Sequence, residues 1–173
     1  MTRIVSLIVF ISLCGTVLPA GAEDDPLRGV IGIRVLAYPT KDSEAAGLTA
    51  DTVQTEVELM LRQYGIRVLS QEEYRKEGAA LTVLVRAFYE KTVSGVRQGY
   101  FSMVILEVEE LAFLARDMRK PTFPTPHLMR TWETHRARTG PPESLKAGTL
   151  ESLQEVVKEF ANKYLAVNPR EAR

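Results

Sequence analysis

The sequence has few of the residues that hold disulfides, metal ions or nucleic acids. Its 173 residues include one cysteine and two histidines, and 22 Lys plus Arg are balanced by 22 Asp plus Glu. This zero formal charge gives no electrostatic reason to expect nucleic-acid binding. A hydrophobic content of 45% excludes a disordered or collagen-like chain. The chain length favours a single domain.

The N-terminal segment has the order of residues found in a secretory signal peptide. Residues 1–22 begin with the cation Arg3, continue with an apolar run over residues 4–13 and end in Ala-Gly-Ala. That order predicts export, with cleavage before Glu23. A membrane anchor is disfavoured because the apolar run is about half of the roughly 20 residues that a bilayer span needs.

The single cysteine, Cys14, lies inside this segment and raises the question of lipidation. A lipoprotein signal requires a small residue directly before the cysteine, and Leu13 is bulky, so we expect no acylation. Removing the 22 residues of the segment leaves 151 with a net charge of −1 and no cysteine. A secreted chain without disulfides must be stabilised by its hydrophobic core. Cysteine-free export favours the bacterial periplasm over a eukaryotic extracellular space, so we expect a periplasmic or secreted protein.

The mature chain begins with a β pattern that returns after one helix. Residues 29–38 (GVIGIRVLAY) are apolar and β-rich, which predicts a strand that is central or covered on both faces. Residues 66–69 (IRVL) predict a second, short strand. A right-handed crossover would place the two strands parallel.

An amphipathic helix is predicted between these strands. Apolar residues recur at three and four positions from Val53 to Tyr64, with polar residues between them. Thr49 or Asp51 is a suitable N-cap, and Gly65 lies where a left-handed C-terminal residue is favoured.

The middle of the chain predicts an antiparallel hairpin. Residues 70–78 are charged and predict a single helical turn. Residues 80–91 and 99–111 predict two long strands around a turn that contains a glycine. Both strands carry large apolar residues on both faces. Residues 112–115 either extend the second strand or form a bend.

The C-terminal third predicts a loop, a strand and a helix. Residues 119–126 contain three prolines, which favours an exposed extended loop. Residues 128–138 predict a last strand that carries Trp132. Residues 150–165 have helical spacing, with Thr149 as a plausible N-cap and Asn168-Pro169 as the stop signal.

These elements predict one α+β domain, a mixed α/β sandwich in the order β-α-β-β-β-β-α. We expect a mixed sheet of about five strands with two amphipathic helices on one face. The organisation is a signal peptide over residues 1–22 and a single domain over residues 23–173, with an ordered core at about residues 29–168.

The layout resembles small modules of the bacterial cell envelope. Residues 29–38, the helix-glycine-strand junction over residues 61–69 and a C-terminal helix ending FANKYLAVNP carry the resemblance. The families in question are the N-terminal domain of TolB and the periplasmic modules of curli-secretion lipoproteins. The resemblance implies non-enzymatic protein binding and supplies no catalytic residue. The chain departs from the curli-secretion type by lacking a convincing lipidation cysteine.

The residues that usually carry chemistry are absent or poorly placed. No serine lies in a G-x-S-x-G turn, and no H-E-x-x-H motif or cysteine pair is present. His127 and His135 are separated by about 26 Å if they lie on one strand. Glu107 and Glu109 share a strand face, but we interpret them as a solvated strand end facing basic residues of a neighbouring strand. We therefore predict no catalytic residue, no cofactor and no metal site.

The distribution of charge suggests one candidate contact surface. Residues 116–138 contain six basic and two acidic side chains, whereas residues 42–77 contain eight acidic and four basic ones. A basic, proline-rich segment beside aromatic residues suits an acidic partner or an anionic membrane surface. The candidate contact residues are Arg119, Lys120, Phe123, Arg130, Trp132 and Arg136.

The hypothesis that follows is a periplasmic interaction or assembly module that is not an enzyme. It would bind an envelope protein through a strand edge or through the basic proline-rich loop, with membrane contact at most peripheral. The alternative is a small protein that binds lipid or another apolar ligand, since the hairpin has more apolar surface than two helices cover. A homodimer that covers this apolar surface is a second explanation.

Overall fold

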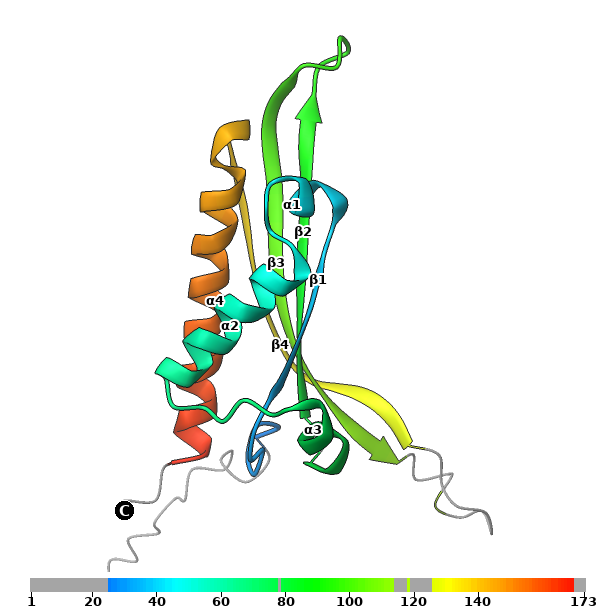
Figure 1. Cartoon of the computed structure of the whole chain (residues 1–173), viewed down its shortest axis with the longest axis vertical. Coiled ribbons are helices and arrows are strands. Elements are labelled where there is room, and N and C mark those ends of the chain that lie inside the picture. The colour runs from blue at the N-terminus through cyan, green and yellow to red at the C-terminus, as the bar shows by residue number, and fades with distance from the viewer. Residues whose placement is uncertain (1–24, 78, 114–117, 119–125, 170–173) are drawn as a thin grey trace, which may run out of the picture.

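A computed structural model describes residues 25–77, 79–113, 118 and 126–169. The elements in chain order are β1 (Arg34–Pro39), α1 (Lys41–Ala45), α2 (Ala50–Gln63), α3 (Gln71–Glu77), β2 (Ala79–Lys91), β3 (Arg97–Phe113), β4 (Pro126–Gly140), a 3-10 turn (Pro142–Ser144) and α4 (Leu145–Val167) (Figure 1). The signal peptide, its cleavage site and Cys14 lie outside the described residues and stay predictions.

The described strands form one mixed sheet in the order β1-β2-β3-β4. β1 is parallel to β2, and the other two pairs are antiparallel. The α+β class and the mixed sheet are confirmed, but the expectation of about five strands is wrong. Residues 66–69 contribute one parallel bridge, from Ile33 to Val68, because the chain turns into α3 before a ladder can extend.

The first strand is shorter than predicted and lies at an edge of the sheet. It begins at Arg34: the residue before it, Ile33, bridges Val68 and not β2, and Gly29 further upstream has a φ of +80°. Its apolar residues do point to both faces: Val35 is fully buried under the helices, whereas Tyr38 is 55% exposed on the opposite face. Apolar side chains on both faces therefore did not mean that both faces are covered.

The predicted hairpin and the helix after the first strand are confirmed. Thr49 Oγ1 accepts a hydrogen bond from the Thr52 amide at the start of α2, and Gly65 follows its end with a φ of +69°. The helix buries Val53, Val57 and Leu61. The spacing of apolar residues was sufficient here because packing and capping favour the same boundaries.

Three further helices differ from the sequence expectation. α1 was not predicted, and α3 is a seven-residue helix instead of a single turn. α4 begins at Leu145, so Thr149 is not its N-cap; its hydroxyl donates to the Leu145 carbonyl at 2.7 Å. Leu145 is buried, which adds a turn to the helix before Thr149. The helix ends at Asn168 as predicted.

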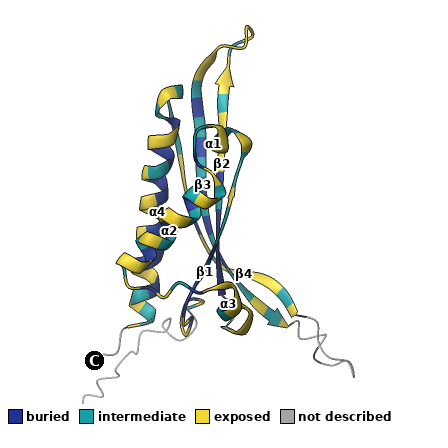
Figure 2. Ribbon diagram, in the orientation of Figure 1, coloured by how far each residue is buried: buried dark blue, intermediate teal, exposed yellow. Residues whose placement is uncertain are grey.

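The two long helices pack on the same face of the sheet, which confirms that prediction (Figure 1). α2 contacts β1, and α4 contacts β3 and β4. The residues buried between the two layers include Val35, Val57, Leu61, Leu81, Val83, Val104, Leu106, Val108, Val156 and Phe160. Figure 2 shows buried residues where the helices meet the sheet and exposed residues along the outer helix surfaces. None of the described helices combines the length and hydropathy of a membrane span.

Candidate functional site

The sheet face opposite the helices is the candidate functional site. Along β3, Val104 and Leu106 are fully buried under the helices, while the alternate residues Met103 and Ile105 point to the other face and are only half-buried. We call this second surface the open face. Its apolar and central residues are Leu36 and Tyr38 of β1, Leu84, Arg86 and Phe88 of β2, and Phe101, Met103 and Ile105 of β3.

Strand register makes the apolar side chains of the open face contiguous. Tyr38 pairs with Leu84, and Leu84 pairs with Ile105, so one row crosses three strands. Further along the hairpin, Phe88 and Phe101 are paired and stack with ring centroids 6.1 Å apart and planes 11° apart. Tyr38 and Phe88 are 55% and 50% exposed. This grouping of large apolar side chains on one sheet face is the reason for treating the open face as the candidate site.

The opposite end of the open face is polar and internally satisfied. Arg130 contacts Glu107 at 2.7 Å and Glu133 at 2.5 Å, and the hydrogen bond to Glu107 raises the pKa of the Arg130 guanidinium. Glu109 accepts a hydrogen bond from Thr82 at 2.7 Å. Glu107 thus faces a basic residue of the neighbouring strand as predicted, but it is not a solvated strand end: it lies in the middle of β3 and its side chain is 15% exposed.

The candidate contact residues from the sequence do not form one surface. Arg119, Lys120 and Phe123 lie outside the described residues. Trp132 lies on the helix face against Phe160, with ring centroids 5.3 Å apart. Arg130 lies on the open face. In a regular strand it would lie on the same face as Trp132, because the two residues are two positions apart. A register shift, which leaves Thr131 without a ladder partner, causes the change.

Arg136, the remaining candidate, also lies on the helix face. Its guanidinium contacts Glu159 at 2.8 Å and Glu155 at 3.6 Å. The neighbouring Arg138 contacts Glu151 of the same helix at 2.5 Å. The charges of Arg136 and Arg138 are therefore balanced by acidic residues of α4, 13 to 23 positions later in the chain.

The described residues contain no group of three or more His, Cys, Asp and Glu side chains placed to hold a metal ion. Both histidines lie on β4, eight positions apart. His135 is 3.9 Å from Glu133, its neighbour on the same strand face.

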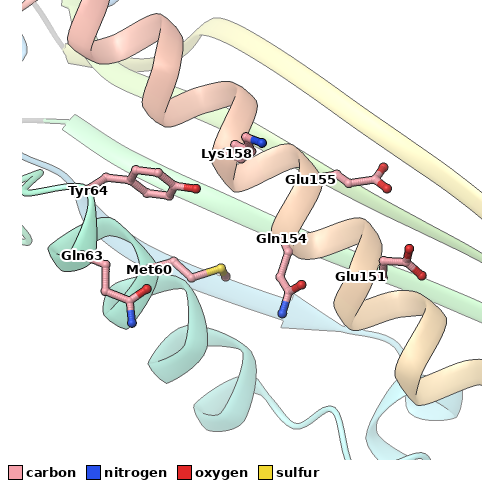
Figure 3. A pocket seen from close by; sticks show the side chains of 7 residues that line it. All are labelled: Met60, Gln63, Tyr64, Glu151, Gln154, Glu155 and Lys158. Atoms are coloured by element: carbon pink, nitrogen blue, oxygen red, sulfur yellow. The ribbon is translucent and has the colours of Figure 1, made fainter.

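A groove of about 470 Å³ lies between α2 and α4 (Figure 3). The side chains along it are mostly polar: Met60, Gln63, Tyr64, Glu151, Gln154, Glu155 and Lys158. Glu151 and Glu155 already contact Arg138 across the helix-sheet boundary. Its lining surface is about equally polar and apolar, whereas sites for lipid-sized ligands are predominantly apolar.

The fold and the site together define an α+β domain with one helix-covered and one open sheet face. No protein-family model and no curated protein matches the sequence.

Solved structures with a similar chain course include two PelC dodecamers from Paraburkholderia phytofirmans. A leucine-to-methionine variant of PelC is 17% identical with a TM-score of 0.40, over 83% of this chain and 91% of that one. A second PelC structure is 16% identical with a TM-score of 0.37, over 79% and 87%. Rare lipoprotein B from Shewanella oneidensis is 13% identical with a TM-score of 0.29, over 77% and 91%. At these scores the neighbours carry no argument about this chain, and its function is argued from its own residues.

Proposed function

We propose that this protein is an exported, non-enzymatic interaction module of the bacterial cell envelope, and that it binds a protein partner through the open face. The observation that supports this proposal is the contiguous apolar surface formed by Tyr38, Leu84, Ile105 and the stacked pair Phe88 and Phe101. The envelope compartment rests on the signal-peptide pattern of residues 1–22.

The composition of this surface favours protein binding. Aromatic residues, Met and Arg are enriched at the centres of protein interfaces. The open face contains three aromatic residues, one Met and one Arg within a few strand positions. Burying apolar surface gives about 25 cal/mol per Å², so covering these side chains would stabilise a complex.

Binding of a partner strand at the edge of β4 is less well supported than binding at the open face. Arg136 donates a hydrogen bond to the His135 carbonyl at 2.9 Å, and the irregularity at Thr131 breaks the regular ladder. Charged side chains and bulges are the features that discourage strand addition at an edge. The basic proline-rich loop stays a prediction, since residues 119–125 lie outside the described residues.

Binding of an apolar small molecule is the weaker proposal. The groove between the helices is lined mostly by polar residues, and a second pocket of about 410 Å³ is lined in part by Arg97, Glu143 and Lys146. Neither pocket includes residues of the open face.

Site-specific photocrosslinking in cells that export the full chain tests the proposal. A benzoylphenylalanine probe at Phe88 is compared with the same probe at Lys158, which lines the groove between the helices. We expect a discrete protein adduct from the first position and none from the second. No adduct from position 88, or adducts only from position 158, would contradict binding through the open face.

A further inference from the structure

Arg86 is the charged residue at the centre of the open face. It lies on β2 between Leu84 and Phe88 on the same face, and it pairs with Met103 of β3. Its side chain is exposed. The guanidinium is therefore placed among apolar side chains, with solvent on one side.

Within the part of the chain that the structure describes, Arg86 has neither an ion pair nor a hydrogen bond. The three arginines of β4 differ in this respect, because Arg130, Arg136 and Arg138 each contact a glutamate. The carboxylate of Glu107, the nearest acidic residue on the open face of β3, is held by Arg130. Arg86 thus has no counterion among the described residues, and it lies beside the exposed apolar side chains of the open face. Among the same residues Arg34, at the other end of that face, also lacks one, but its Nε is buried.

We propose that Arg86 binds a carboxylate of the partner, and that this carboxylate lies between apolar residues in an acidic-apolar protein segment. The inference rests on the proposed function and specifies the chemistry of the partner. The argument for this partner is charge complementarity. An unpaired guanidinium among apolar side chains is complementary to a carboxylate that also has apolar neighbours.

The chemistry of arginine strengthens this assignment. A guanidinium forms two parallel hydrogen bonds with a carboxylate, which fixes direction as well as charge. Phe88 and Met103 would exclude water from such a pair once the partner is seated. An ion pair of this kind is worth more when it is partly desolvated than when it is exposed.

The dimensions of the surface suit a polypeptide. Tyr38, Leu84 and Ile105 lie on three adjacent strands, a width of about 10 Å. From Leu84 to Phe88 the surface extends about 13 Å along β2. A strand or helical turn carries apolar side chains over this area with one carboxylate among them.

Charge reversal tests this inference. A benzoylphenylalanine probe is placed at Phe101 of the full chain in cells, and the adduct yield is measured for the unaltered chain, Arg86→Glu and Arg86→Lys. We expect Arg86→Glu to lower the yield at least tenfold and Arg86→Lys to lower it two- to threefold. Arg75→Glu is the matched control, since Arg75 is exposed on α3, and its yield should be unchanged. A thermal midpoint of Arg86→Glu equal to that of the unaltered chain excludes misfolding as the cause.

The crosslinked peptide and its charge partner complete the test. We expect mass spectrometry to locate the adduct in a segment with Asp or Glu between apolar residues, and reversal of that acid to Arg to restore the yield with Arg86→Glu. An adduct that survives Arg86→Glu, or that contains lipid, a second copy of this chain or a segment without an acid, would overturn the inference. If the otherwise unaltered chain with the probe at Phe101 forms no adduct at all, the proposed function is overturned as well.

Discussion

The two faces of the sheet have similar sequences and different surroundings. Leu106 and Ile105 are neighbours on β3 with side chains of similar size, yet Leu106 is fully buried under the helices and Ile105 lies half-buried on the open face. The helix face is stabilising because α2 and α4 complete its packing. The open face has the apolar side chains of a core, but neither α2 nor α4 covers it. Under the proposed function, the second face is kept uncovered for binding.

The same contrast holds for charged residues. Arg136 and Arg138 of β4 contact glutamates of α4, so their charges are used within the domain. Arg86, on the other side of the sheet, has no such contact among the described residues. Sequence alone does not separate these arginines, because the acids that pair with two of them come from α4, whose placement on the sheet depends on tertiary packing.

The largest expected effect is a difference between alanine substitutions on the two faces. Leu106→Ala removes a fully buried side chain and should lower the free energy of unfolding by about 2–5 kcal/mol. Ile105→Ala removes a partly exposed one and should cost about 1 kcal/mol. Urea unfolding of both variants measures the difference. Equal costs would mean that the open face is covered within the domain.

A smaller loss is expected where Gly148 of α4 packs against Tyr100 of β3. A Cβ added at Gly148 would overlap the hydroxyl of Tyr100, which is buried on the helix face. Gly148→Ala should therefore destabilise the protein by about 1–3 kcal/mol, although the same change in an exposed helix stabilises by about 1 kcal/mol. The measurement is the urea midpoint. Adding Tyr100→Phe should recover part of the loss, and no recovery would contradict the proposed overlap.

The smallest effect concerns the acid dependence of α3, outside the sheet. Glu73 accepts a hydrogen bond from the Ser70 amide and Ser70 Oγ accepts one from the Glu73 amide, a capping box. The bonds from the Ser70 amide and Arg67 lower the pKa of Glu73 from 4.5 to about 2. A lowered pKa stabilises the fold above pH 4.5, and this contribution is lost as the pH falls toward 2.

The thermal midpoint measured against pH tests this dependence. The difference between the unaltered chain and Glu73→Gln should shrink as the pH falls from about 5 to about 2. Glu72→Gln, at the neighbouring exposed position, should follow the unaltered chain throughout. If the thermal midpoint of Glu73→Gln stays at a constant distance from that of the unaltered chain at every pH, the charge of the Glu73 carboxylate does not stabilise the fold.

Sequence patterns predicted correctly those elements for which side-chain spacing and the capping or turn residues indicate the same boundaries. The spacing of Val53, Val57 and Leu61 predicted α2, and the hairpin of β2 and β3 followed from alternation and a turn. The start of α4 was not predicted, although Pro142 opens the 3-10 turn that leads into it; Leu145 is buried against Ala87 and Tyr100, which are far from it in the sequence. The surplus of apolar residues on both hairpin faces was visible in the sequence, but which face the helices cover depends on tertiary packing.

The candidate site was predicted less well than the fold. Trp132 and Arg136 were expected on the same surface as Arg130, and the register shift at Thr131 separates them. Such a bulge has no signal in one sequence. The face of Arg86 follows from the period of two along β2, but its lack of a counterion depends on the positions of acids elsewhere in the fold.

The central claim is that the open face binds a partner and contributes little to the fold. It is tested most directly by the adduct yield of a Phe88→Ser chain that carries the photocrosslinking probe at Tyr38. Both residues are at least half-exposed on the open face. We predict that the adduct is lost while the free energy of unfolding stays within about 1 kcal/mol of the unaltered chain. An undiminished adduct, or its loss together with collapse of stability, would contradict the account.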